Sequence, residues 1–491
     1  MKIRTILTIA VLFTWCQIGE STSETPTGQF TIYHWGDIHS HNYPWIDEDG
    51  ELVGGYAHIA GLIKEQRALG NEPLVLVNGG EFTGSPLSSI TEGASQVRIL
   101  NSIKPSAFAI GSSEFAYGWR TLQRRLAKAK FPTLLSNVRV AQSNERPFEE
   151  HLYIEHQGVK IRIISLIDKD FVHSVPYEGV FELDVSDPIN FARNFVNRYR
   201  DNTDVLIAMT YLGWKGDSLL AQTVRGLDLI IGGNNKKEVH PPSVINGTMI
   251  SHSGPHGKFV SRLDLEFKQQ TRKLNLQKAE LIPITTIIPE DKSIDRLIRR
   301  LERRHTRKLD RQIGRLEVDL VKRTDAPCNL AQFTVSAIHT FAPSSNFAVI
   351  SNNALGKSIR RGYLRERDVW EIYPQESSLI VFQITGDELL NILWSRVDDS
   401  SRFLTWSGVK VRAREGNVVS LTIDNIPVRM GEQFSVVTTN QVWDNFDALF
   451  GIPRGDRAFF NIPTSVREIL VEFIESQTSI SHREVDWWDV K

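Results

Sequence analysis

Cysteine is scarce in this sequence, since Cys16 and Cys328 are the only two among 491 residues. If the N-terminal segment that holds Cys16 is removed, Cys328 has no partner, and intrachain disulfides are excluded. The fold must then rely on an apolar core, for which the hydrophobic content of 41% is ordinary. The formal net charge is only −1, so charge gives no reason to expect nucleic acid as a partner.

The N-terminal segment has the order of features typical of a secretory signal peptide. Lys2 and Arg4 precede the apolar run ILTIAVLFTWC, and the polar stretch QIGESTSETPTG follows it. The run is too short to span a bilayer, and Ser21 and Ser23 supply small residues before a cleavage site. The C-terminal stretch SISHREVDWWDVK is polar and carries no anchor signal. We therefore expect residues 1–23 to be a signal peptide and the protein to be secreted and extracellular, without a membrane anchor.

Residues 28–285 show the alternation of a layered α/β domain. Short apolar runs such as PLVLVNGG, KIRIISLID and LDLIIGG are typical of strands that are buried on both faces. Between them, YAHIAGLIKEQRALG and INFARNFVNRYR have the apolar spacing of helices. Within this domain, Asn246 begins the triplet Asn-Gly-Thr and is the expected N-glycosylation site.

A strongly basic segment follows, and we predict an interdomain helix over residues 286–325. Between residues 292 and 315 there are ten Lys and Arg against three Asp and Glu, a local net charge of 10 − 3 = +7. One interpretation is a surface for an anionic partner. The other is a solvated helix face without a partner.

Residues 326–491 are predicted to form a second, smaller α+β domain. The helical segment AQFTVSAIHTF leads into short strands such as SLIVFQITG and FSVVTTN. The predicted architecture is therefore a layered α/β sandwich followed by a smaller α+β domain.

Polar motifs follow several predicted strands of the first domain, where α/β sheets build their sites. They read HWGDIHSH, NGGEFTGSP, GSSEFAYG, MTYLG and GGNNKKEVH. Their order and spacing resemble the 5′-nucleotidase/apyrase family, a branch of the dinuclear metallophosphoesterases. RERDVWEIYPQESSLIVFQITGDELLNIL in the second domain fits the same family. The resemblance covers essentially the whole mature chain, and implies a metallophosphoesterase-like sandwich and a 5′-nucleotidase C-terminal domain.

The resemblance implies two divalent metal ions that polarise a phosphoryl group and activate water. Asp37 and His39 match the first family motif, and Glu81 stands where a bridging Asp is usual. The other ligand positions are replaced: Ser112 and Ser113 stand for Asn and His, Tyr211 for His, and Asn234 for His. We therefore predict a catalytically inactive member with no metal cofactor. Asp37, His39 and Glu81 are then vestigial ligands, which would hold Zn, Mg or Ca only if activity remained.

In this family the second domain binds the nucleoside. Phe403 matches one stacking aromatic, Trp443 is a shifted candidate for the other, and Asp456 falls at an Asp that faces the nucleoside. These three are the candidate nucleotide-binding residues, with ADP as a possible ligand. An alternative interpretation is that the aromatic residues belong to the core.

Asp456 also ends the tripeptide Arg454–Gly455–Asp456, which can bind integrins when it is exposed on a turn. A secreted chain with a dismantled site and a lengthened loop resembles chrysoptin-like salivary antiplatelet proteins of blood-feeding flies, which are 5′-nucleotidase-related. The resemblance implies that the chain inhibits platelet aggregation as an antagonist of the fibrinogen receptor, a host platelet integrin. Two alternatives stay open: metal-dependent hydrolysis of ADP and AMP, and nucleotide binding without hydrolysis.

Overall fold

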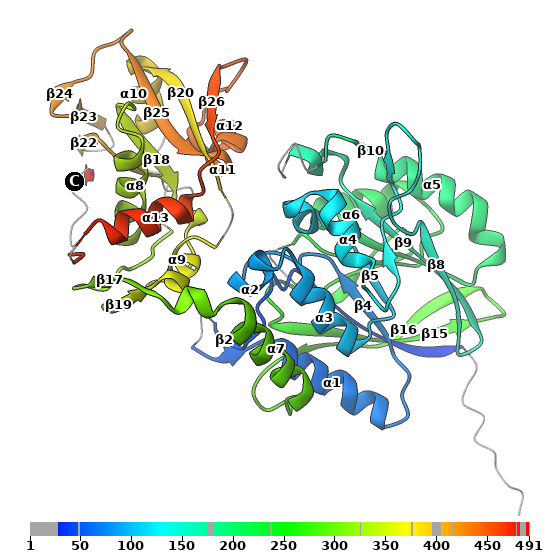
Figure 1. Ribbon diagram of the computed structural model, residues 1–491. Helices are drawn as coiled ribbons and strands as arrows, with labels where there is room; N and C mark the ends of the chain where they lie inside the picture. The colour runs from blue at the N-terminus through cyan, green and yellow to red at the C-terminus, as the bar shows by residue number, and fades with distance from the viewer. Residues whose placement is uncertain are drawn as a thin grey trace, which may run out of the picture.

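The computed structural model describes most of the chain from Gly28 onward (Figure 1). The described residues are 28–47, 50–173, 180–235, 238–324, 326–374, 377–394, 404–414, 417–477, 479–481 and 488–490. The predicted signal peptide, residues 1–23, lies outside them. No helix in these ranges is both long and apolar enough to cross a membrane.

The N-terminal part is built on two six-stranded sheets (Figure 1). The first has the order β16-β15-β1-β4-β5-β6, with bounds Lys273–Pro283, Phe259–Lys268, Gln29–Gly36, Leu74–Asn78, Ala107–Ala109 and Thr133–Leu134. The second has the order β13-β14-β12-β11-β9-β8, with bounds Val239–Ile245, Thr248–His252, Leu229–Gly232, Val205–Tyr211, Val159–Ile167 and His151–His156. In the first sheet β1, β4, β5 and β6 are parallel, and in the second β9, β11, β12 and β14 are parallel.

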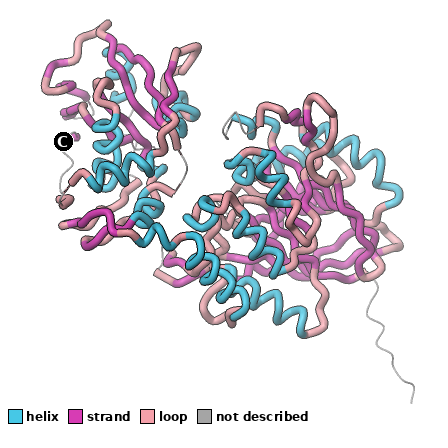
Figure 2. The backbone as a smooth tube through the Cα atoms, viewed as in Figure 1, coloured by secondary structure: helices cyan, strands magenta, loops and turns pink. Residues whose placement is uncertain are grey.

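The two sheets pack face to face, and helices cover their outer faces (Figure 2). Ile32 and Leu76 of the first sheet share an apolar cluster with Ile163 and Ile207 of the second. The outer face of the first sheet packs against α1 (Tyr56–Ala68), α3 (Ala94–Ile103) and α4 (Trp119–Leu126). The outer face of the second packs against α5 (Pro188–Tyr199) and α6 (Gly213–Thr223). Strands buried on both faces explain the continuous apolar runs of the sequence.

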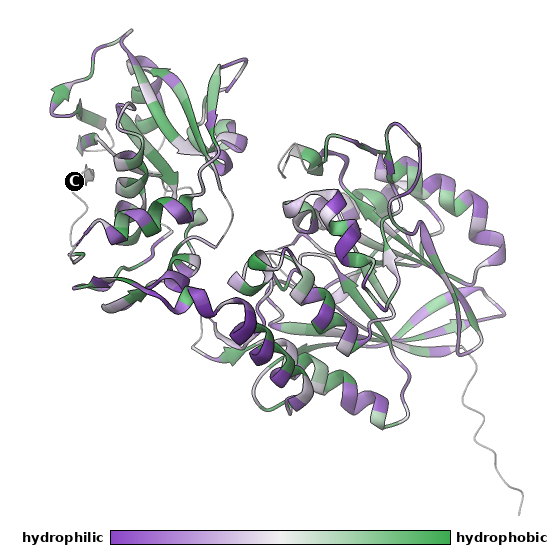
Figure 3. Cartoon of the chain, in the orientation of Figure 1, coloured by the Kyte–Doolittle hydropathy of each residue, from purple (hydrophilic) through white to green (hydrophobic). Residues whose placement is uncertain are grey.

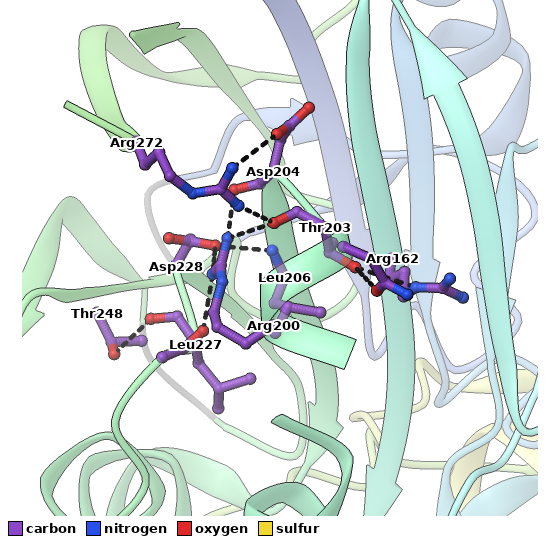
Figure 4. A network of polar contacts seen from close by, with 11 residues as sticks. Arg162, Arg200, Thr203, Asp204, Leu206, Leu227, Asp228, Thr248 and Arg272 are labelled. Carbon is purple, nitrogen blue, oxygen red and sulfur yellow. Dashed lines mark hydrogen bonds and ion pairs between the residues drawn. The ribbon is translucent and has the colours of Figure 1, made fainter. Parts of the chain in front are cut away.

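A polar cluster fixes the entry to the central strand β11 (Figure 4). Arg200 donates to the Asp228 carboxylate at 2.6 Å and to the carbonyl of Thr203 at 2.8 Å. The same carboxylate accepts the backbone N–H of Leu206 at 2.7 Å. Burial raises the pKa of Asp228, and the charge of Arg200 opposes that rise. The cluster holds the β11 and β12 entry loops together, at the end of the strands away from the candidate site.

The C-terminal part has a five-stranded sheet of order β21-β18-β25-β20-β26. The strands are Leu404–Ser407, Phe347–Ser351, Gln433–Thr439, Leu379–Thr385 and Phe459–Ile462. One apolar cluster joins this sheet to α8 (Asn329–Phe341), α9 (Glu366–Ile372) and α13 (Val466–Glu475). Another joins it to α10 (Gly386–Trp394), α11 (Asn440–Asp444), α12 (Phe446–Phe450), β22 (Val409–Arg414) and β23 (Asn417–Ile423).

Short elements complete the chain. They are β2 (Trp45–Ile46), β3 (Leu52–Val53), α2 (Pro86–Ile90), η1 (Ser112–Tyr117), β7 (Val138–Val140), η2 (Lys169–His173), β10 (Leu183–Val185), η4 (Arg200–Asn202), η6 (Asn352–Ala354), β19 (Gly362–Arg365), β24 (Ile426–Pro427) and β27 (Trp488–Val490). The predicted layered sandwich followed by a smaller α+β part is confirmed. The predicted limits 28–285 and 326–491 stay predictions, although both sheets of the sandwich lie within the first range.

Only part of the basic segment 286–325 is helical, which corrects our prediction. The helix α7 covers Lys292–His305, the turn η5 covers Arg307–Asp310, and β17 (Gln312–Leu316) pairs with β19. Asp291 caps the start of α7 by accepting from the backbone N–H of Ser293 and Ile294. The helix ends at Thr306, whose hydroxyl bonds the carboxylate and carbonyl of Glu302. The helical spacing therefore predicted α7 correctly, whereas the structure of the residues after it depends on the pairing of β17 with β19.

Candidate functional site

The carboxyl ends of strands from both sheets meet at one edge of the sandwich. The residues there include Asp37 and His39 after β1, Glu81 after β4, Tyr211 at the end of β11, and Asn234 after β12. Contacts between the strand ends hold this edge together, because the Asn78 amide of β4 donates to the carbonyls of Thr210 at 2.7 Å and Ile231 at 3.1 Å. The strand-end motifs of the sequence are thus brought together in one place.

Asp37 is buried and fully engaged with protein groups. Its Oδ1 accepts the Tyr211 hydroxyl at 2.7 Å, and its Oδ2 accepts the backbone N–H of Asn234 at 2.7 Å and of Asn235 at 3.4 Å. Burial raises the pKa of the Asp37 carboxyl to about 6, although these hydrogen bonds lower it. The lone pairs that a metal ion would use are therefore directed at protein donors.

The Tyr211 ring fills the space between the strand ends. A Cβ atom added to Gly79, Gly111 or Gly233 would lie 3.1, 2.7 and 3.1 Å from Cδ2 of this ring, respectively. The three glycines come from the loops after β4, β5 and β12, so the ring packs directly on backbone from three sides. Tyr211 stands at the position where the resemblance implied a histidine ligand. Its phenol group donates a hydrogen bond to Asp37, whereas a histidine at this position would act as a metal ligand.

Glu81 is completely buried, and neither carboxyl oxygen has a hydrogen-bond partner among the described residues. Burial raises the pKa of Glu81 well above its ordinary value, and the negative charges of Glu114 and Asp37 raise it further. Burial therefore favours the protonated form of the Glu81 carboxyl group over the carboxylate.

Glu114 lies beside Glu81 but has the opposite environment. Its carboxylate accepts backbone N–H groups from Gly80 at 3.1 Å, Glu81 at 2.6 Å, Phe82 at 3.2 Å and Gly111 at 2.9 Å. These bonds shape the loop after β4 around the carboxylate. Glu114 is thus a structural residue, while Ser112 and Ser113 before it offer only half-buried hydroxyls.

His39 belongs to an aromatic cluster. Its ring centroid lies 5.8 Å from that of His256, which in turn lies 4.6 Å from His41 and 5.6 Å from Trp45. Burial lowers the pKa of His39, and it lowers that of His41 to about 4 and that of His256 to about 3. The rings are therefore neutral at physiological pH and pack as apolar groups.

These residues do not fit a dinuclear metal centre. In the part of the chain that the structure describes, no group of three or more His, Cys, Asp or Glu side chains is arranged to hold a metal ion. Asp37, His39 and Glu81 share one edge of the sandwich but do not form one ligand group. A pair of divalent ions would have to displace the Tyr211 hydroxyl and remove the proton of Glu81.

A second buried polar group escaped the sequence analysis. His252 Nε2 lies 2.9 Å from the Asp217 carboxylate, which also accepts the Thr210 hydroxyl at 2.5 Å. Both side chains are essentially without solvent exposure. His252 ends β14, at a strand end like the motifs that were recognised, and that position is the signal that could have found it.

The Arg454–Gly455–Asp456 tripeptide forms an exposed turn between α12 and β26 (Figure 1). Gly455 has φ 57, and a Cβ there would meet nothing within 4 Å. Arg454 is held by its backbone N–H, which donates to Asp447 at 2.7 Å, and by its guanidinium, which lies 5.4 Å from the Trp443 ring centroid. Asp456 makes no hydrogen bond or ion pair with any described residue.

Two of the three candidate nucleotide-binding residues can be placed: Trp443 is buried and Asp456 is exposed. Trp443 is only 5% exposed, and its ring packs on Phe382, Phe446 and Phe459 as well as on Arg454. In this conformation it offers no free face to a base, so the core interpretation describes its position. Phe403 lies outside the described residues.

Asn246 lies in the exposed turn between β13 and β14 with φ 50. Its amide donates to the carbonyl of Gln222 at 3.0 Å, while the hydroxyl of Thr248 is buried against Leu227. The position is accessible, and glycosylation there stays a prediction.

Comparison with known proteins agrees with this architecture. A family model described as 5′-nucleotidase, C-terminal domain, matches residues 312–450. The chain is 26% identical to Protein UshA of Yersinia enterocolitica over 92% of both proteins. It is 25% identical to a 5′-nucleotidase of Vibrio vulnificus over 97% of this chain and 96% of that protein.

Solved structures share the fold over both parts of the chain. The 5′-nucleotidase precursor from Thermus thermophilus aligns with a TM-score of 0.76 at 20% identity, covering 94% of this chain and 99% of that one. The 5′-nucleotidase from Candida albicans aligns with a TM-score of 0.66 at 12% identity, covering 91% and 98%. Because residues 312–450 match the C-terminal domain of 5′-nucleotidases, and relatives and solved structures span almost the whole chain, this chain belongs to the 5′-nucleotidase family.

Proposed function

We propose that this 5′-nucleotidase-family chain is a secreted binding protein that inhibits platelet aggregation by occupying an integrin of the fibrinogen-receptor type. The observation that carries the proposal is the exposed Arg454–Gly455–Asp456 turn. An integrin ligand must present a carboxylate to a receptor-bound cation and a guanidinium to acidic residues of the second subunit. Asp456 and Arg454 supply these two groups on neighbouring corners of one turn.

The turn is anchored at both ends, which favours binding because less freedom is lost in the complex. On one side Asp447 accepts the backbone N–H of Arg454. On the other side Arg457 donates to the carboxylate of Glu388 at 2.6 Å and to the carbonyl of Gln383 at 2.8 Å. Between these anchors the carboxylate of Asp456 stays free to bind a cation held by the receptor.

We also propose that the chain does not hydrolyse nucleotides by the family's metal mechanism. The environment of Tyr211 supports this part of the proposal. The Tyr211 ring packs against three glycines at a position where the metal mechanism needs a metal ligand. Its hydroxyl donates a hydrogen bond to the Asp37 carboxylate. Burial raises the pKa of Glu81, the third remaining candidate ligand, and its carboxyl group has no hydrogen-bond partner among the described residues. We therefore assign no catalytic residue.

The alternative function is hydrolysis of extracellular ADP or AMP, and the observation that favours it is the similarity to relatives such as the 5′-nucleotidase of Vibrio vulnificus. Phosphate release in the presence of added Zn²⁺, Mg²⁺ or Ca²⁺ measures it directly. Turnover that is lost in Asp37→Ala would overturn the proposal. Calorimetry with ADP separately detects nucleotide binding without turnover.

Competition for fibrinogen on purified platelet integrin tests the receptor hypothesis. Asp456→Glu moves the carboxylate by one methylene, and we expect inhibition to weaken by at least about 30-fold, the loss of about 2 kcal/mol typical of a central contact. Asp201→Glu is the matched control, because Asp201 is also exposed but lies in the N-terminal part. Equal inhibition by wild type and Asp456→Glu would refute the assignment.

A further inference from the structure

Seven cationic side chains along α7 and η5 have no partner within the described residues. They are exposed, and none forms a hydrogen bond or ion pair with another described residue: Lys292, Arg296, Arg300, Arg303, Arg304, Arg307 and Lys308. Four of them, Arg296, Arg300, Arg303 and Arg307, are spaced by four, three and four residues, and we call them the arginine stripe. Arg296, Arg300 and Arg303 lie on one face of α7, and Arg307 follows at the start of η5, just past the end of the helix.

The stripe faces away from the body of the protein. Ile294, Ile298 and Leu301 on the opposite face of α7 are buried in the apolar cluster that also contains α1 and α3. Figure 3 shows α7 coloured largely as hydrophilic along its visible face. Since the apolar face is already covered, the helix cannot insert into a lipid surface as an amphipathic helix does.

The three acidic side chains of the segment bond to residues outside the stripe. Asp295 pairs with Arg299 at 2.9 Å, and Glu302 accepts the Thr306 hydroxyl at 2.7 Å. Asp310 pairs with Arg367 at 2.7 Å. The stripe therefore concentrates positive charge on a chain whose net charge is −1 overall and, by the count of +7 for residues 292–315, −1 − 7 = −8 outside this segment.

We propose that the arginine stripe binds a linear sulfated polysaccharide. Guanidinium groups form bidentate hydrogen bonds with tetrahedral oxyanions more readily than ammonium groups do, and a single row of them matches a row of sulfates on an extended chain. Nucleic acid is a poorer match, because residues 292–311 contain no Phe, Tyr or Trp on which bases could stack. This binding surface is independent of the Arg454–Asp456 turn, which lies in the C-terminal part.

Heparin of defined length is the probe, and the test variant is the full chain with R296Q, R300Q, R303Q and R307Q. Glutamine is a good helix former, and the replaced side chains have no partners among the described residues, so the thermal unfolding temperature is expected to stay unchanged. The control carries K130Q, K215Q, R225Q and K273Q, four exposed cations that are scattered over the N-terminal part. Both proteins lose the same formal charge.

With four ionic contacts, and a salt dependence of the size known for nucleic acids, affinity for heparin should fall roughly 50- to 150-fold between 50 and 200 mM salt. We expect the stripe variant to lose most of the binding at low salt and the control to retain it. Three results would overturn the proposal: no binding of heparin by the wild type at low salt, equal losses in the two variants, or tighter binding of duplex DNA than of heparin.

Discussion

Glu81→Gln should stabilise this protein at neutral pH, although Glu81 occupies a metal-ligand position of the family. The carboxyl group is completely buried without a partner among the described residues, and burial holds its folded-state pKa well above 4.5. An acid whose pKa is raised on folding contributes stability below its unfolded pKa and loses it as the pH rises towards the folded pKa. Each pH unit in this window costs about 1.4 kcal/mol. From pH 4.5 to 7 the loss reaches up to about 3 kcal/mol, and Gln does not incur it.

Glu114→Gln is the matched control, since it is an equally buried glutamate in the adjacent loop. Its two oxygens accept four backbone N–H groups, and Gln would turn an amide N–H₂ group towards two of them. Leaving two buried donors unsatisfied costs about 2 kcal/mol or more. The two substitutions should therefore have opposite signs at pH 7.

Urea unfolding of the wild type and both variants at pH 4.5, 5.5 and 7 measures these differences. At pH 4.5 Glu81→Gln should differ from the wild type by less than about 1 kcal/mol, because both side chains are then neutral. Its advantage should grow as the pH rises. A Glu81→Gln protein that is less stable than the wild type at pH 7, or that loses a bound metal ion, would refute the protonated-site interpretation.

Further substitutions probe other parts of the fold. Tyr211→Phe removes the hydroxyl that donates to Asp37 at 2.7 Å. The pKa of Asp37 should therefore rise above about 6, which a pH titration monitored by NMR would detect. An unchanged pKa would show that this hydrogen bond does not stabilise the carboxylate. Arg200→Met leaves the half-buried Asp228 carboxylate without its cation and should lower the free energy of unfolding by about 2 kcal/mol, whereas a loss below about 0.5 kcal/mol would mean that water replaces the guanidinium. Gly93→Ala places a Cβ 2.2 Å from the Phe82 ring at φ +79 and should cost more than about 2 kcal/mol in thermal unfolding, which a neutral result would contradict.

The sequence predicted the layered fold well because strand burial leaves a strong local signal. Runs such as LVLVN in β4 and VLIAMTY in β11 are apolar throughout most of their length, since both of their faces are covered. The helical spacing of residues 292–305 was equally clear. The prediction of a helix was wrong beyond Thr306, because β17 forms by pairing with β19, which is distant in sequence.

At the candidate site the sequence located the strand-end motifs, because these motifs are local and keep their order; that they are replaced metal ligands stays a prediction. The contacts that fill the space between the strand ends could not be predicted from neighbouring residues along the chain. Tyr211 contacts glycines from three separate loops, and the protonated state of Glu81 depends on burial and on Glu114 and Asp37. The same holds for the Asp217–His252 pair, whose members come from different elements.

The sequence by itself determined the strand-end motifs, the Arg454–Asp456 tripeptide and the basic composition of residues 292–315. Only the tertiary structure decided that the tripeptide is exposed while Trp443 is buried, and that the arginines form one row without partners among the described residues. Exposure and pairing depend on which distant segments pack together, and neighbouring residues along the chain carry no record of those contacts.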